Sequence, residues 1–257
     1  MPLITLTTDW GTTDYFVGAF KGDLLTACPD ATIIDISHNI AAHDLVPGAF
    51  IFKNAWQHFP KGTVHVCAVS GTSDIPSPLI AINYSGHYFI GVDNGFFSLV
   101  LDEAPEEAYF ILNAKGHKVV QNSAVLASSA AYLAKGGKIS EMGEKMTALV
   151  EKSLLRPVTE ESIIRGSVIY TDSHGNLVTN ITKSLFERIS RGREFDIILK
   201  TREYIISEIS VDYFDASRGN LLAFYNEAGF LEIAINHGNA GMLLGLHYSD
   251  IIRVEFK

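Results

Sequence analysis

The chain is poor in cysteine and lacks the spacings of common metal sites. Only two of its 257 residues are cysteine, Cys28 and Cys67, and they lie far apart inside apolar segments. Isolated cysteines of this kind are typical of small buried hydrophobic side chains. No CxxC, HxH or HExxH spacing occurs, so no zinc or other metal site is expected.

The chain also lacks a basic excess and a long apolar run. Acidic residues outnumber basic ones by 29 to 20, for a formal net charge of −9. This charge argues against a broad nucleic-acid or anionic-membrane surface, although it suits a cationic ligand. No apolar run reaches membrane-spanning length, and the chain starts with a strand rather than a targeting segment. We therefore expect a cytoplasmic protein that binds neither nucleic acid nor membrane.

Apolar content is high, at 47% of residues, which is ample for a buried core. Up to about residue 143 the pattern alternates between strands and helices. Strands are expected at residues 4–8, 32–36, 63–69, 79–84, 88–92 and 109–112, and helices at 15–27, 44–58 and 123–134. This alternation indicates an α/β domain with a largely parallel sheet, which we place at residues 1–150.

The composition then changes. A more charged stretch containing Pro157 is expected to form a linker over residues 151–165. The remaining residues, 166–257, show turns and little helix, with short strands expected at 167–171, 177–181, 195–199, 221–225, 230–235 and 251–256. Short strands at this spacing favour a smaller all-β domain, a barrel or a sandwich.

The first strand ends in a carboxylate, Asp9, followed by a glycine turn. Ligands of open α/β sheets bind beyond the carboxyl ends of the strands, so Asp9 is expected at a ligand site. A carboxylate there can accept hydrogen bonds from both hydroxyls of a ribose, which suggests a nucleoside-like ligand. Asp14 is expected one turn away, and Thr12 or Thr13 is expected to cap the following helix.

Two polar loops in the second half are further candidates. Residues 172–180 read DSHGNLVTN between two β-branched strands. A tight hairpin explains this loop, or Asp172 and Asn176 face a ligand. Residues 236–240 are small and polar and would let a flat base approach the backbone, although an ordinary turn explains them equally well.

Seven segments, in order along nearly the whole chain, together resemble one family. They are LTTDWG (6–11), VGAFKG (17–22), IDISH (34–38), FPKGTVHV (59–66), DNG (93–95), GNLVTN (175–180) and LEIAIN (231–236). The resemblance is to the S-adenosylmethionine (SAM) hydroxide adenosyltransferases, relatives of the SAM-dependent fluorinase and chlorinase. Each segment alone is weak, but their joint order is a strong signal for the fold.

The resemblance implies a homotrimer of α/β and β-barrel domains, with the ligand bound between the α/β domain of one subunit and the barrel of the next. By similarity, Asp9 holds the ribose diol, Asp14 and Asp172 lie near the methionine ammonium, and Asn176 lies near the adenine edge. The other ligand-binding residues expected are Trp10, His43, Glu227, Asn236, Asn239 and Ala240.

The implied reaction is displacement at the ribose C5′ carbon of SAM. The sulfonium is already a good leaving group, so the enzyme aligns a nucleophile opposite sulfur and strips its water. With water or hydroxide as the nucleophile, the products are adenosine and methionine. No cofactor is implied.

The chain departs from the hydrolytic members of the family, which use Asp, Arg and His side chains to position water. Ser70 stands in the place of the Asp, Ser77-Pro78 replaces an arginine pair, and Gln121 takes the place of the His. Ser70, Gln121, Asn122 and Ser123 are then the polar side chains expected to act in catalysis. The halogenating members also lack the Asp-Arg-His set, so three readings stay open: hydrolysis, halide transfer, or silent binding of adenosine.

Two further points concern the ligand. Glu227 stands where the family usually has a serine near the methionine carboxylate, and it is expected to point to solvent. If it points inward, the natural ligand is a nucleoside without a carboxylate. A calcium-dependent nucleoside hydrolase is disfavoured, because Thr7 and Thr8 stand where such a site would carry more carboxylates.

Overall fold

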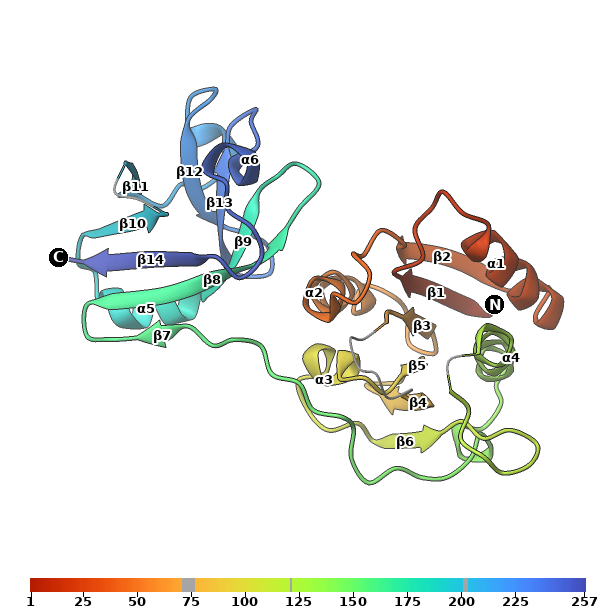
Figure 1. Cartoon of the computed structure of the whole chain (residues 1–257). Helices are drawn as coiled ribbons and strands as arrows, with labels where there is room; N and C mark the ends of the chain where they lie inside the picture. The colour runs from red at the N-terminus through yellow and green to blue at the C-terminus, as the bar shows by residue number, and fades with distance from the viewer. Residues whose placement is uncertain (71–76, 121, 201–202) are drawn as a thin grey trace. The chain divides into compact units, whose positions relative to one another are not determined.

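The computed structural model describes residues 1–70, 77–120, 122–200 and 203–257 (Figure 1). These residues fall into two compact units, Met1–Ser153 and Leu154–Lys257, called here the first and the second unit.

The first unit is built on a six-stranded sheet in the order β2-β1-β3-β5-β4-β6. The strands are β1 (Leu3–Thr8), β2 (Thr32–Ser37), β3 (Val64–Ala68), β4 (Leu79–Tyr84), β5 (His87–Val92) and β6 (Glu107–Phe110). Strands β2, β1, β3 and β5 are parallel, and β4 runs antiparallel to both of its neighbours. The expectation of a largely parallel sheet is therefore confirmed.

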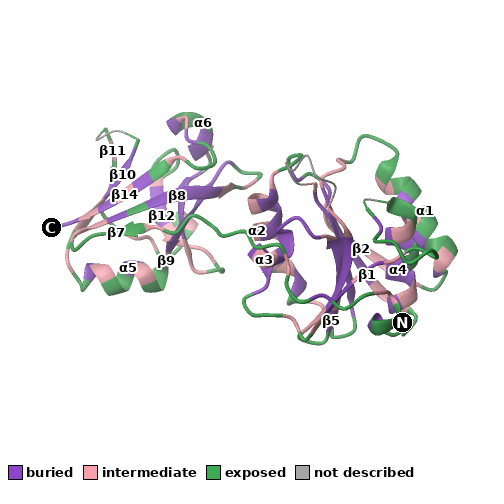
Figure 2. Ribbon diagram, turned by 60° about the horizontal axis from the view of Figure 1, so that its bottom comes forward, coloured by how far each residue is buried: buried purple, intermediate pink, exposed green. Residues whose placement is uncertain are grey.

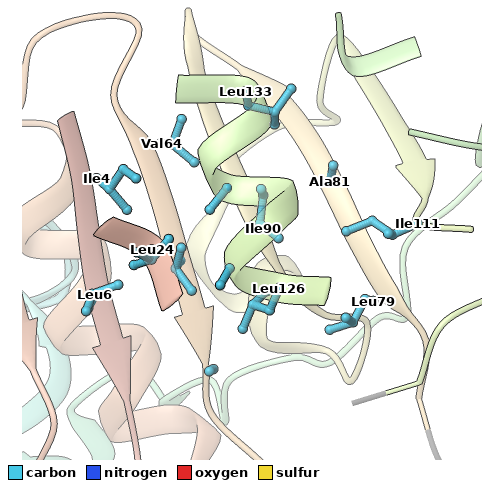
Figure 3. Close-up of a cluster of buried hydrophobic side chains, with 14 of the residues drawn as sticks. Ile4, Leu6, Leu24, Val64, Leu79, Ala81, Ile90, Ile111, Leu126 and Leu133 are labelled. Carbon is cyan, nitrogen blue, oxygen red and sulfur yellow. The ribbon is translucent and has the colours of Figure 1, made fainter. Parts of the chain in front are cut away.

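Helices cover both faces of this sheet (Figures 1 and 2). They are α1 (Phe16–Ala27), α2 (Leu45–Trp56), α3 (Phe96–Val100) and α4 (Ser123–Ala134), followed by the 3₁₀ turn η1 (Ile139–Glu141). On one face Ile4 of β1, Leu24 of α1 and Leu126 of α4 belong to one buried cluster (Figure 3). On the other face Phe52 of α2 packs in a second cluster with Phe96 of α3. Each such side chain contributes roughly 1.5–3 kcal/mol when fully buried.

In the first unit one local expectation was wrong and one element was not predicted. Helix α1 begins at Phe16 with Tyr15 at the N-cap and has no side-chain cap, so neither Thr12 nor Thr13 caps it. The threonines lie too early in the exposed turn to reach the free N–H groups of the helix. Helix α3, which has only five residues, was not expected. It follows Gly95, whose backbone is left-handed, and the Asn94 side chain accepts from the Phe96 N–H at its start.

The second unit is an antiparallel sheet in the order β11-β10-β14-β8-β9-β13-β12, with β7 paired to β8. Its strands are β7 (Val158–Thr159), β8 (Ile163–Thr171), β9 (Leu177–Thr182), β10 (Phe195–Leu199), β11 (Tyr204–Ile206), β12 (Leu221–Tyr225), β13 (Phe230–Ile235) and β14 (Ile251–Phe256). The end strands β11 and β12 lie in contact, so the sheet nearly closes into a barrel around one apolar core. This agrees with the expected barrel-like all-β architecture.

The second unit also contains elements that the sequence pattern did not predict. Strand β7 and the start of β8 lie within residues 151–165, the stretch expected as a linker. Helices α5 (Lys183–Ser190) and α6 (Ala240–Leu244) and the 3₁₀ turn η2 (Tyr213–Asp215) interrupt the strands. Helix α5 is short and buries Phe186, and Thr182 caps it by accepting from the Leu185 N–H.

Candidate functional site

A cavity of about 670 Å³ lies in the first unit, at the carboxyl ends of β1 and β3 and beside α1 and α4. This size is typical of small-molecule sites. Six of the side chains expected to bind ligand or act in catalysis line it: Asp9, Trp10, His43, Ser70, Asn122 and Ser123. Another cavity, of about 560 Å³ near α3 and residues 145–153, is lined by none of the expected residues.

Asp9 is held at the cavity wall by the neighbouring strand β3. Its backbone N–H donates to the carbonyl of Ala68 at 3.3 Å, and its Oδ2 accepts from the backbone N–H of Ser70 at 2.9 Å. Within the described residues no side chain or backbone group donates to Oδ1. The arrangement leaves a half-buried carboxylate oxygen at the site where ligands of parallel sheets bind.

The turn after Asp9 is held by His38, the residue that follows β2, and by Thr8 at the end of β1. The backbone N–H of Gly11 donates to the carbonyl of His38 at 2.7 Å, and that of Trp10 donates to the hydroxyl of Thr8 at 3.3 Å. Gly11 has φ +71°, a backbone conformation that favours glycine. The Trp10 ring packs edge-on against Phe20 at 5.2 Å, which places an aromatic wall beside the carboxylate.

Helix α4 begins at the cavity. Asn122 is its N-cap, and its Oδ1 accepts from the Val125 N–H at 3.1 Å. The capping bond uses the carbonyl of Asn122, so its amide NH₂ is the group left for a ligand. The adjoining Ser123 lies in the first turn, where the positive end of the helix dipole favours an anion or a developing negative charge. Gln121, the fourth residue expected in catalysis, lies outside the described residues.

Helix α1 brings residues to the cavity that the sequence pattern did not single out for it. Tyr15, Phe16, Phe20 and Asp23 all line it. Phe16, Ala19, Phe20 and Asp23 follow the i, i+3, i+4, i+7 spacing of one helix face, and only Phe20 of these is buried. Asp14, in contrast, is exposed and does not line the cavity, so the structure does not bring it to Asp9.

In the second unit the loop between β8 and β9 is organised by Asp172. Its Oδ1 accepts from the backbone N–H groups of His174 and Asn176, and its Oδ2 accepts from the Asn176 side chain at 3.0 Å. These bonds are those of a well-formed hairpin loop, which was the simpler interpretation of the sequence. They also hold Asn176 in one orientation, so the structural and ligand-binding readings are compatible.

The two polar loops of the second unit lie against each other. Gly175 has φ +83°, and a Cβ there would lie 2.1 Å from Cγ of Asn239. The N–H of Gly241 donates to the Gly175 carbonyl at 2.9 Å, and Asn239 caps α6 by accepting from the Met242 N–H. The loops at 172–176 and 236–240, both expected to face a ligand, are therefore packed together, with Ala240 buried as the first residue of α6.

Two buried amide oxygens in this region lack partners within the described part of the chain. They are Oδ1 of Asn176 and Oδ1 of Asn236, and both residues are more than nine-tenths buried. The Asn236 amide NH₂ donates to the Ala216 carbonyl at 2.7 Å. A buried acceptor without a donor is costly, so these two oxygens are unfavourable for the fold as the described residues stand.

Glu232 is a buried carboxyl that the sequence pattern missed, because it looks like one polar position in an apolar strand. It accepts from the Asn226 side chain at 3.0 Å, beneath the turn that carries the exposed Glu227. Burial raises the pKa of Glu232, the Asn226 hydrogen bond opposes this, and the nearby charge of Asp172 raises it further.

The described residues show neither a metal-binding cluster nor a membrane-spanning helix. Within residues 1–70, 77–120, 122–200 and 203–257, no three His, Cys, Asp or Glu side chains come together as they would to hold a metal ion. Over the same described residues, no helix is long and apolar enough to cross a membrane.

Known proteins similar to this chain define its family. Residues 4–143 match the profile of the SAM hydroxide adenosyltransferase N-terminal domain, and residues 166–253 match that of the C-terminal domain. The chain belongs to this family. It is 31% identical to an (R)-S-adenosyl-L-methionine hydrolase of Methanocaldococcus jannaschii, over 100% of this chain and 97% of the relative.

The chain is also similar to a fluorinase and to a solved structure. A fluorinase of an Actinoplanes species is 25% identical, over 91% of each chain. Among solved structures, an uncharacterized conserved protein from Thermotoga maritima superposes with a TM-score of 0.86 at 27% identity, covering 98% of this chain and 99% of that one. The resemblance stated from the seven sequence segments is confirmed. The roles of individual site residues stay predictions.

Proposed function

We propose that the protein binds SAM and transfers its 5′-deoxyadenosyl group to water or hydroxide, giving adenosine and methionine. Family membership along nearly the whole chain supports this reaction, and so does the relationship to proteins named as SAM hydrolases and fluorinases. The observation that supports it best in the structure is Asp9, whose carboxylate lies in the cavity with Ser70 bonded to only one of its oxygens.

The proposed reaction is a single displacement. The C5′–S bond breaks and its electron pair leaves with sulfur, which becomes the neutral thioether of methionine. A C5′–O bond forms, and the proton of the attacking water passes to solvent. Because the leaving group is already activated, alignment and partial desolvation of the nucleophile supply most of the catalysis.

The described cavity residues suggest how the substrate is held. Asp9 accepts hydrogen bonds from the ribose hydroxyls, and the aromatic side chains of Trp10 and Phe20 supply an apolar wall. Ser70, the Asn122 amide and the first turn of α4 at Ser123 offer donors for a nucleophile that carries negative charge. The described lining contains Asp9 and Asp23 but no lysine or arginine, which suits a cationic sulfonium substrate. No metal or other cofactor takes part.

The second unit supplies the other half of the site in this proposal. The protein forms a homotrimer in which the first unit of one subunit and the second unit of the next share one ligand. Asn176 then lies near the adenine edge, the backbone at 236–240 frames the base, and Asp172 and Asp14 lie near the methionine ammonium. Asn176, held in one orientation by Asp172, supports this arrangement.

The test is incubation of the full-length protein with SAM, followed by chromatography. Appearance of adenosine in proportion to protein, and its loss in Asp9→Ala, supports hydrolysis. A 5′-halo-adenosine formed with chloride or fluoride present would instead support halide transfer. Adenosine binding without any product would support a catalytically silent binding protein. This alternative is favoured by Ser70 and Gln121, which stand where the resemblance implies Asp and His. Light scattering is expected to give three times the chain mass of 28.2 kDa.

A further inference from the structure

A buried chain of polar contacts lies directly behind the turn that carries Asp9. Nδ1 of His38 lies 2.8 Å from the hydroxyl of Thr8, and both residues are almost completely buried. The same hydroxyl accepts from the backbone N–H of Trp10, the residue after Asp9. Thr8 therefore connects the imidazole of His38 to the backbone of the ligand-binding turn.

The other side of the imidazole faces an ion pair. Nε2 of His38 lies 3.1 Å from Oδ1 of Asp35, within ion-pair distance but not aligned for a hydrogen bond, and Oδ2 of Asp35 accepts from the ammonium of Lys21 at 2.6 Å. Burial raises the pKa of the Asp35 carboxyl, but its contacts with Lys21 and His38 outweigh this and lower it overall. Asp35 is thus a carboxylate, and a negative charge on this side of the ring favours an N–H at Nε2 of His38.

This assignment fixes which group donates and which accepts in the contacts among His38, Thr8 and Trp10. With the proton on Nε2, Nδ1 of His38 is an acceptor, so the Thr8 hydroxyl donates to it. The oxygen of Thr8 then keeps its lone pairs for the Trp10 N–H. In the other tautomer, two hydrogens would compete between Nδ1 and the Thr8 oxygen, and the buried hydroxyl hydrogen would have to turn away from His38.

We infer that His38, kept in one tautomer by Asp35, is a positioning residue that acts through Thr8 to fix the Trp10 backbone and hence the Asp9 carboxylate for a ribose diol. His38 does this twice, because its own carbonyl also accepts from the Gly11 N–H. The inference rests on the proposed nucleoside site and adds to it the residues that set the geometry of its carboxylate. None of the three side chains needs to touch the ligand.

The test compares adenosine with 2′-deoxyadenosine, which lacks one of the two hydroxyls. The ratio of their dissociation constants in the full-length protein reports the diol contact and not overall folding. In Thr8→Val, which keeps the shape but removes the hydroxyl, adenosine binding is expected to weaken about tenfold while 2′-deoxyadenosine binding changes less than about twofold. Thr8→Ser, which keeps the hydroxyl, is expected to restore the parental ratio. Asp35→Asn is expected to lower the ratio by a smaller factor.

The chain offers a matched control in the same strand. Thr5 is equally buried, and its hydroxyl lies 2.7 Å from Nδ1 of another buried histidine, His65, but within the described residues its side chain makes no hydrogen bond to the turn. Thr5→Val loses the same kind of bond, so it is expected to lower thermal stability and leave the binding ratio unchanged. In steady-state assays with SAM, Thr8→Val is expected to raise KM with little change in kcat, since a diol contact acts on bound substrate and transition state alike.

The outcomes separate this inference from the proposed function. If the parent protein binds both nucleosides equally, the diol site itself is wrong. If the parent discriminates and Thr8→Val and Asp35→Asn keep its ratio, the diol site stands and the positioning role of His38 is overturned. The same conclusion follows if Thr5→Val lowers the ratio as much as Thr8→Val, because any buried Thr–His bond would then have the effect.

Discussion

Nε2 of His65 lies 3.1 Å from Nδ1 of His87 in the core of the first unit, and Nδ1 of His65 contacts the hydroxyl of Thr5. The His65 ring also stacks on Phe89 at 5.1 Å. The pair lies on the sheet face covered by α2, away from Asp9. A histidine in these surroundings is held neutral, because a second charge beside His87 and loss of hydration both oppose protonation.

This pair predicts an acid-sensitive fold. Burial, and secondarily the charge of His87, lowers the pKa of His65 from 6.5 to about 3. Between these values the unfolded chain binds a proton that the folded chain does not, so unfolding free energy falls as pH falls from about 6.5 towards 3. The slope from one such group is at most about 1.4 kcal/mol per pH unit. Burial and the charge of Lys61 also lower the pKa of His87.

Urea unfolding at pH 5, 6 and 7 measures this slope. His65→Gln is expected to be less stable at pH 7 than the parent and to lose less stability on acidification. His58→Gln, which alters an exposed histidine, is the matched control and keeps the parental slope. An equally steep loss in His65→Gln would show that other groups cause the acid sensitivity.

Asp9→Ala is expected to weaken adenosine binding about 100-fold or more. The change removes a charged acceptor from two hydroxyls, and a hydrogen bond to a charged group contributes about 1.5–3 kcal/mol. Isothermal titration calorimetry gives the constants, and circular dichroism checks folding, since Asp9 also binds the Ser70 N–H. Asp30→Ala removes an exposed aspartate beyond the end of α1 and serves as control. Parental affinity in Asp9→Ala would remove Asp9 from the site.

The sequence predicted the layered first unit because long periodic segments bury one face, as the pairing of β1 with β2 and β3 shows. It predicted that Asp9 lies at a candidate site because ligands of parallel sheets bind beyond the carboxyl ends of the strands, whereas Ser70 was expected there only from the family resemblance. The sequence did not predict the short helices α3 and α5. They have five and eight residues and depend on caps and tertiary packing. The sequence did not predict that Asp23 lines the cavity, because a single carboxylate on a helix is typical of a solvated side chain. Its place becomes clear only when α1 and α4 are seen to line the same cavity.

The degenerate catalytic positions predict a failed rescue. By the family resemblance, Ser70→Asp combined with Gln121→His would restore two of the three side chains of the hydrolytic members but not the arginine, whose expected place is Ser77-Pro78. Without that cation nothing balances the added carboxylate or orients the water. We expect kcat for SAM hydrolysis to stay within about tenfold of the parent, since one tenfold step corresponds to only about 1.4 kcal/mol of barrier. Adenosine release followed by chromatography measures it, and a rise of several hundredfold would show the arginine to be dispensable.

Glu227 is the subject of the last test, because a glutamate that pointed into the site would repel a ligand that carries a carboxylate. It lies exposed in the turn between β12 and β13, where Asn226 accepts the N–H groups of Gly229 and Phe230 and the buried Glu232 lies below. A side chain in this position meets water, so Glu227→Ser is expected to change SAM affinity by less than about threefold, the scale of a screened surface charge. Adenosine, which has no carboxylate, is the matched ligand for the same titration. If the variant binds SAM more than tenfold tighter with adenosine unchanged, Glu227 faces the methionine carboxylate, and SAM is then not the ligand that the parent protein prefers.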